Sequence, residues 1–276
     1  MNRPVCLRPE RRELALFAVC AAGFLTLNVL PLARVGVYAV SASGFDRTWA
    51  GMNNFRSVLA NAYFRLAVRN TLRFTWLSVP GVLLYSLALA LMLQGGRGRM
   101  LVVLLLPGAL PSAAISRVWY VFFPQIMSFS IWGVPVSPHE VSLHLLFLWK
   151  NLGLFTLLML GGLSGLPVSA LEAAALDGAK PLRLFLSVKL PLLLPTAVFA
   201  GIYGIVASMR VFREAFLLYG RYPANEIYMI QHYMNNHFDK LNYHTLSAAA
   251  LLFLLPVTAL IGFMVYVERR LGEGTW

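Results

Sequence analysis

Six polar or charged residues stand inside or at the edge of long apolar segments of the chain: Arg117, Lys150, Asn151, Arg210, Arg213 and Glu214. An ionisable side chain is costly in an apolar surrounding, and one that occurs there marks a route for polar solutes or pairs with another charge. We therefore predict that these six residues line a substrate pathway. For Lys150 and Arg117 the alternative is snorkelling or a packing pair. Arg213 and Glu214 are sequence neighbours and face different directions on a helix, which argues against a direct pair between them.

Motifs for nucleotide binding, metal binding or a disulfide scaffold do not occur in the sequence. There is no G-x-x-x-x-G-K-[ST] stretch to hold nucleotide phosphates. The five histidines lack metal-ligand spacing, and two cysteines near the N-terminus, Cys6 and Cys20, exclude a disulfide scaffold. The sequence therefore predicts no catalytic set, no metal site and no enzyme activity of its own.

Composition places the chain in a membrane. Hydrophobic residues make up 59% of its 276 residues and charged residues 12%, and the mean hydropathy is +0.69. Soluble domains are about half apolar and a quarter charged. The net charge of +12 would suggest nucleic acid in a soluble protein, but the apolar content favours a membrane instead and no nucleic-acid partner.

Apolar segments long enough to cross a bilayer occur six times. A span needs roughly 20 mostly apolar helical residues, because lipid offers no partner to unpaired backbone groups. We predict an all-α polytopic protein with six transmembrane helices at Leu14–Ala33, Asn70–Gly96, Met100–Phe123, Leu143–Leu163, Leu194–Leu217 and Leu246–Val267. Prolines are expected to kink these spans or to shape their packing: Pro31, Pro80, Pro107, Pro111 and Pro256.

Basic residues set the expected orientation. They gather before the first span, between spans two and three, between spans four and five, and after span six. The positive-inside rule then places both termini in the cytoplasm. A further basic group at the outer ends of the spans would attract an acidic sugar, hold a binding protein or bind lipid headgroups: Arg65, Arg69, Arg73, Arg213, Arg221 and Lys240.

The loop between spans four and five, residues 164–191, differs from the other loops. Ser169 and Glu172 form a capping-box pattern that predicts a helix start. Gly178 predicts the end of that helix, because glycine adopts a left-handed C-cap conformation without steric cost. Pro181 suits the first position of a second short helix, and Pro191 is expected to end it. Two short helices joined by a tight turn would project into the cytoplasm as a docking site.

The same loop carries a family resemblance. Glu172-Ala173-Ala174, Asp177-Gly178-Ala179 and Leu190-Pro191 resemble the EAA loop of ABC importer permeases. Asn70-Thr71-Leu72 and Leu106-Pro107 resemble the carbohydrate type, and the chain is similar to the maltose-type first permease over residues 53–267.

The resemblance implies a type I ABC importer permease fold and a set of partners. These are a second permease subunit that is a different chain, two cytoplasmic ATPase subunits that bind ATP and Mg²⁺, and an extracytoplasmic solute-binding protein. In this family the first loop helix inserts into a cleft of the ATPase. The implied docking residues are Glu172, Ala173, Ala174, Asp177 and Gly178. Helix capping for Glu172 and turn stabilisation for Asp177 remain alternative roles.

Together these features predict a cytoplasmic segment 1–13, a transmembrane permease domain 14–268 that carries the coupling loop 164–191, and a cytoplasmic tail 269–276. The expected function is half of the pathway of an ATP-driven importer for a sugar or oligosaccharide, either neutral or acidic, in the bacterial inner membrane. An ATP-independent secondary transporter or channel is the alternative. A membrane scaffold that docks a cytoplasmic partner without transport is a third hypothesis.

Overall fold

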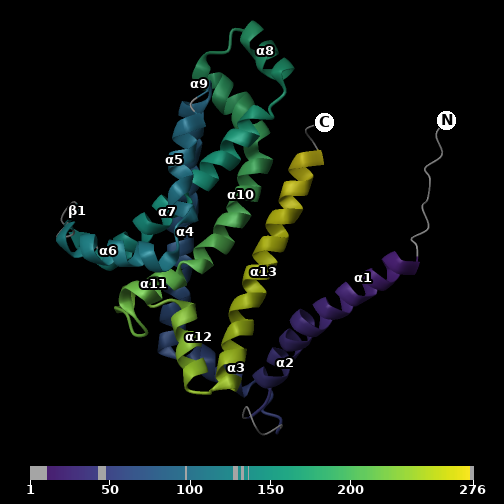
Figure 1. The fold of residues 1–276 in the computed structure, drawn as a ribbon, viewed down its shortest axis with the longest axis vertical. Coiled ribbons are helices and arrows are strands. Elements are labelled where there is room, and N and C mark those ends of the chain that lie inside the picture. Colours follow the sequence, from purple (N-terminus) through teal and green to yellow (C-terminus); the bar gives the residue numbers. More distant parts are fainter. Residues whose placement is uncertain are drawn as a thin grey trace. The chain divides into compact units, whose positions relative to one another are not determined.

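The computed structural model describes residues 11–42, 48–96, 98–126, 130–131, 134–135 and 137–273. These are almost entirely helical (Figure 1), which confirms the predicted all-α class. Two short strands, β1 (Ser130–Ile131) and β2 (Val134–Pro135), form a small antiparallel hairpin. Backbone contacts divide the chain into two compact units. Unit 1 comprises residues 1–61 and 237–254, and unit 2 comprises residues 62–236 and 255–276.

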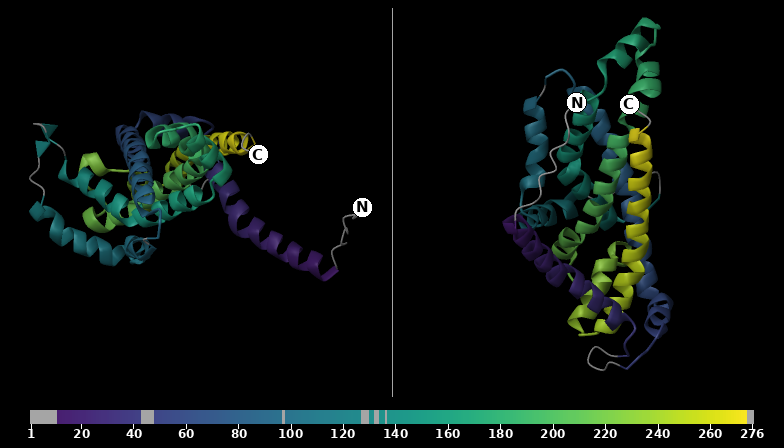
Figure 2. Two further views of the ribbon diagram at one scale, coloured as in Figure 1. Left: turned by 90° about the horizontal axis from the view of Figure 1, so that it is seen from above. Right: turned by 90° about the vertical axis from the view of Figure 1, so that its right-hand side faces the viewer.

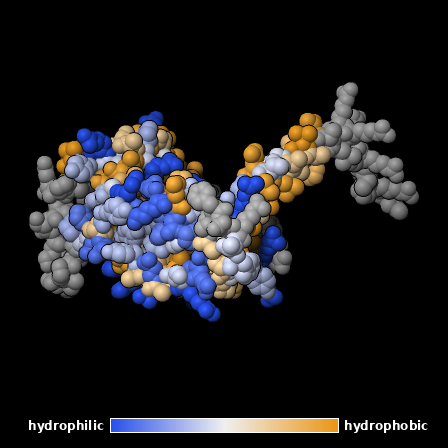
Figure 3. Space-filling model, turned by 90° about the horizontal axis from the view of Figure 1, so that it is seen from below, coloured by the Kyte–Doolittle hydropathy of each residue, from blue (hydrophilic) through white to orange (hydrophobic). Residues whose placement is uncertain are grey.

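Unit 1 begins with one long apolar helix built from three pieces. These are α1 (Arg11–Phe24), the π-helical turn η1 (Leu25–Val29) and α2 (Leu30–Ala39). Its hydrophobic side chains are exposed along most of its length (Figure 3), as expected for a lipid-facing helix. The unit also contains α3 (Asn53–Ala60) and the first part of α13 (Tyr243–Glu273). The Asn54 amide holds the end of α2, because it donates hydrogen bonds to the carbonyls of Ala39 (2.9 Å) and Ser41 (2.7 Å).

Unit 2 holds most of the helices. In chain order they are α4 (Ala62–Leu93), α5 (Gly98–Ala109), α6 (Ser112–Ile126), α7 (Pro138–Ser164), α8 (Val168–Leu176), α9 (Pro181–Leu184), the π turn η2 (Phe185–Lys189), α10 (Leu190–Arg210), α11 (Phe212–Tyr219), the 3₁₀ turn η3 (Asn225–Ile227), most of α12 (Ile230–Asp239) and the later part of α13. The central helix is α7, which packs against α4, α5 and α10.

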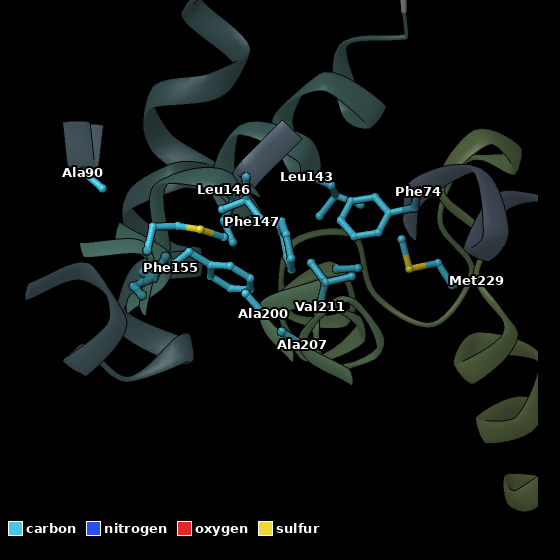
Figure 4. Packing of buried hydrophobic residues seen from close by; sticks show 14 of the residues in the cluster. Phe74, Ala90, Leu143, Leu146, Phe147, Phe155, Ala200, Ala207, Val211 and Met229 are labelled. Carbon is cyan, nitrogen blue, oxygen red and sulfur yellow. The ribbon is translucent and has the colours of Figure 1, made fainter. Parts of the chain in front are cut away.

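The core of unit 2 lies around α7 (Figure 4). Phe147 packs edge-on against Phe74 of α4, with ring centroids 5.6 Å apart, and Phe155 is fully buried. In lipid the helices gain little from the hydrophobic effect, so close approach at small residues carries the packing. At Gly153 the backbones of α7 and α5 meet, and a Cβ there would lie 2.1 Å from the carbonyl oxygen of Leu104.

The third predicted span is not one straight helix. In the described residues, five helices are long and apolar enough to cross a membrane, and α5 with α6 make a sixth span only as a pair bent by 94° (Figures 1 and 2). Pro111 explains the break. It disfavours helical geometry at the residue before it, while its own carbonyl accepts the amides of Ala114 (3.0 Å) and Ile115 (3.2 Å) and starts α6.

Pro191 does not end a helix, contrary to the sequence-based expectation. The chain runs from α9 through η2 into α10, and the whole segment from Pro181 to Tyr219 is one candidate span of 39 residues. The reason is the π turn: the Leu190 amide bonds to the Phe185 carbonyl, five residues back. This wider turn accommodates a proline that lacks a donor and would crowd the preceding carbonyl. Pro31 follows η1 at the same spacing.

Candidate functional site

A cavity of about 380 Å³ opens in unit 2 where broken helices meet α7. Its volume lies within the range of small-ligand pockets. The end of α5, the start of α6, the middle of α7, the end of α10 and the start of α11 contribute its walls. The lining residues are Gly108, Ser112, Leu146, Phe147, Lys150, Asn151, Leu154, Tyr203, Ala207, Arg210, Val211, Arg213 and Glu214.

An ion pair across the cavity joins Lys150 of α7 to Glu214 of α11. Ser112 of α6 completes a triangle: its hydroxyl donates to Glu214 Oε1 (2.7 Å) and accepts from Lys150 Nζ (3.0 Å). The Glu214 side chain is 4% exposed and the Lys150 side chain 23%. The triangle therefore ties three helices together at a nearly buried point.

Two helix N-termini favour the carboxylate of Glu214. It lies in the first turn of α11 and contacts Ser112, the first residue of α6. The positive end of a helix dipole stabilises an anion placed there. Lys150 stands near the middle of the 27 residues of α7, so this charged group lies far from both ends of a candidate membrane span.

The loop after α7 forms an exposed helical knob at one end of unit 2 (Figure 1). None of the residues of α8 is buried. A Schellman motif ends the helix: the Gly178 amide bonds to Ala175 O (3.0 Å) and the Ala179 amide to Ala174 O (3.1 Å), with Gly178 at φ +74°. Because glycine adopts this conformation without penalty, the turn is fixed by the sequence.

Comparison with known proteins assigns the family. The profile of the family "Binding-protein-dependent transport system inner membrane component" matches residues 88–273, which is more than half of the chain. The chain belongs to this family. It is thus a multi-pass permease of the inner membrane, and the predicted family is confirmed.

The permease resembles curated transporters over most of its length. It is 28% identical to the trehalose/maltose transport system permease protein MalF of Thermococcus litoralis over 236 residues, 79% of this chain and 80% of that protein. It is 27% identical to the sulfoquinovosyl glycerol transport system permease protein SmoG of Agrobacterium fabrum over 245 residues, 81% and 80% of the two chains.

The fold matches a solved importer. A chain of a bacterial ABC transporter involved in the import of the acidic polysaccharide alginate superposes with a TM-score of 0.75 at 19% identity. The match covers 94% of the permease and 96% of that chain. This likeness confirms the importer permease fold predicted from the sequence.

The permease structure brings five of the six predicted pathway residues together. Four of them, Lys150, Asn151, Arg213 and Glu214, line the cavity with Arg210. Arg117 does not: it is exposed on α6 and is not among the lining residues. Among nearby aromatic residues, Tyr203 lines the cavity, whereas Trp149 packs on Trp119 with centroids 5.7 Å apart and Tyr219 hydrogen-bonds Ser142.

Ser112 is a residue of this candidate site that was not predicted from the sequence. A serine carries no charge and is common in helices, so it gave no signal by itself. Its position directly after Pro111 was the available clue, since a break at that proline puts the first turn of α6 where it can meet polar groups.

The predicted docking residues lie on the exposed knob. Glu172, Ala173, Asp177 and Gly178 are exposed, and Ala174 is partly so. The predicted capping box was wrong in detail. The helix starts at Val168 after Pro167, without a side-chain cap, because a proline just before the helix supplies extended geometry and shifts the start ahead of Ser169.

Proposed function

We propose that this permease is a transmembrane subunit of an ATP-driven importer for a sugar or oligosaccharide, and that it forms half of the translocation pathway. The names of its relatives support a sugar substrate: trehalose/maltose, sulfoquinovosyl glycerol and trehalose. A further relative transports sn-glycerol-3-phosphate. The cavity between α6, α7 and α11 supplies the part of the pathway that belongs to this chain.

In this proposal the exposed knob formed by α8 and the turn after it couples transport to ATP hydrolysis by the partner subunits. The observation that carries this part is the exposure of α8 and of its apolar ends: Leu176 is 89% exposed and Val168 is 64% exposed. Apolar side chains exposed beyond the spans mark a protein interface. A rigid helix of small residues suits a cleft in a cytoplasmic ATPase, and Glu172 and Asp177 would face basic groups there.

The proposed complex has five parts besides lipid. This chain pairs with a second permease subunit of different sequence, two ATPase subunits bind ATP and Mg²⁺, and a solute-binding protein delivers the sugar from outside. A solved alginate transporter complex contains an oligosaccharide-bound periplasmic protein, which supports that last partner. Both termini and the knob lie in the cytoplasm in this arrangement, following the distribution of basic residues.

Co-purification tests the coupling. We expect Glu172→Lys to lower the yield of the ATPase subunits that purify with the permease and to abolish sugar-stimulated ATP hydrolysis. Glu226→Lys is the matched control, because Glu226 is also exposed and acidic but lies outside the knob. If Glu172→Lys leaves complex yield and stimulated hydrolysis equal to those of Glu226→Lys, the docking assignment is wrong.

Vesicle assays separate the remaining hypotheses. Purified permease without ATPase subunits should move no sugar into liposomes, and the full complex should do so only with ATP. Uptake by the permease alone would favour a secondary transporter or channel. A complex that docks its partner yet moves no solute would favour a scaffold.

A further inference from the structure

The cavity has an excess of positive charge. Its lining contains three cationic side chains, Lys150, Arg210 and Arg213, and one carboxylate, Glu214. Lys150 and Glu214 neutralise each other through their ion pair. The two arginines account for the remaining charge.

Arg210 and Arg213 have no carboxylate partner in the part of the chain that the structure describes. Glu214 is close in sequence but is held by Lys150 and Ser112. Each guanidinium is exposed and lines the cavity, so its five donors are available to a ligand.

The spacing of the two arginines places their positive charges close enough to repel each other. Arg210 is the last residue of α10 and Arg213 lies three residues later, in the first turn of α11. Residues three apart on helical backbone share a face, and like charges in that relation repel each other. An anion that contacts both guanidinium groups would relieve this repulsion.

We propose that the cavity selects sugars that carry an anionic group, and that Arg210 and Arg213 bind that group together. Guanidinium forks match the geometry of carboxylate, sulfonate and phosphate oxygens. Tyr203 offers a ring face to the sugar, and Asn151 offers a polar contact for a hydroxyl. The Lys150–Glu214 pair does not bind the anion; it holds α7 and α11 in place around it. This inference rests on the proposed importer function and names its substrate class.

Chemical protection of the arginines tests the proposal directly. The permease is purified with the subunits it assembles with, placed in phosphatidylcholine nanodiscs and treated with phenylglyoxal, which modifies accessible guanidinium groups. Peptide mass spectrometry reports the rate at Arg210 and Arg213, with exposed Arg269 of α13 as the internal control. The probes are methyl β-D-glucuronide and methyl β-D-glucoside, which differ only by a carboxylate in place of a hydroxymethyl group.

We expect the glucuronide to slow modification of Arg210 and Arg213 but not of Arg269, and the glucoside to leave all three rates unchanged. Replacing one arginine removes a charged hydrogen-bond contact, so Arg213→Gln should raise the glucuronide concentration for half-protection of Arg210 by about 10- to 100-fold. Arg213→Lys should have a smaller effect, because it keeps the charge and loses only the fork geometry. Arg269→Gln should have none.

Several outcomes would overturn the proposal. Equal protection by glucuronide and glucoside would show a sugar site without anion preference, and equal protection by inorganic phosphate would show a simple anion site. Low reactivity of both arginines before any sugar is added would mean that a partner subunit or lipid headgroup covers them; adding anionic lipid to the discs distinguishes these two.

Uptake in proteoliposomes made from the same preparation reports on the importer function separately. ATP-driven uptake of neutral sugars, together with no protection by glucuronide, would refute the anion preference and leave the importer intact. Protection by glucuronide without ATP-driven uptake of any sugar would refute the importer and leave the anion-binding cavity supported.

Discussion

Removing the carboxylate of Glu214 should destabilise the permease markedly. In Glu214→Gln, Lys150 keeps neutral acceptors, the Ser112 hydroxyl and the amide oxygen of the new glutamine, but the mostly buried ammonium loses its counter-charge. Breaking a buried pair by removing one partner costs about 3 to 5 kcal/mol. Because the Lys150 side chain is still 23% exposed and can reach cavity water, we expect a loss near the lower limit, about 3 kcal/mol.

A double variant distinguishes an uncompensated charge from lost packing. Lys150→Met with Glu214→Gln removes both charges and keeps similar side-chain volumes. We expect it to recover most of the stability lost in Glu214→Gln, because no unpaired charge remains. Unfolding of the purified permease by denaturing detergent gives the free energies, with Glu226→Gln as the exposed control. Equal stability losses in the single and double variants would refute this account of the pair.

Two further changes probe the packing and the pH response. A methyl group at Gly153 would meet the Leu104 backbone, so Gly153→Ala should cost about 2 kcal/mol in detergent unfolding; Gly161→Ala, which meets nothing within 4 Å, should be neutral or stabilising. Burial lowers the pKa of His232 in α12 from 6.5 to about 4, so on acidification the unfolded chain takes up this proton first. Stability should fall from pH 6.5 towards pH 4, by up to about 3 kcal/mol through this residue. His232→Gln should reduce that fall, and an unchanged pH profile would contradict the assignment.

The loop after α7 was largely predictable because its geometry is local. Gly178 alone can adopt the positive φ that the turn requires at that point, and Pro181 fixes the first turn of α9. These properties belong to single residues and their neighbours in the chain. The start of α8 was predicted wrongly because two neighbouring residues each favour a helix start. The helix begins directly after Pro167 and not after Ser169.

The effect of each proline was not predictable in the same way. Pro80 and Pro256 lie inside α4 and α13 without ending them, whereas Pro111 separates α5 from α6. The residue type is the same, so the surroundings decide the outcome. At Pro111 the new direction of α6 allows it to pack against α11, and this tertiary contact cannot be read from a window around the proline.

The ion pair between residues far apart in the sequence could not be predicted either. Lys150 and Glu214 were both recognised as costly charges in apolar segments, but 64 residues separate them, and no local pattern indicates that they meet. Sequence identifies which side chains need a partner. Only the fold shows which partner each one obtains and that, among the described residues, Arg210 and Arg213 pair with no carboxylate.

Two backbone breaks border the same cavity, and this explains why the site lies there. One is the bend between α5 and α6 at Pro111, and the other is the turn at Val211 between α10 and α11. Helix ends expose backbone groups that lipid cannot satisfy, so such breaks persist at membrane depth only where protein or a water-filled cavity surrounds them. The breaks therefore require a polar cavity, and their helix N-termini in turn favour the carboxylate of Glu214. Because Glu214 neutralises Lys150, the net positive charge of the cavity lining comes from Arg210 and Arg213.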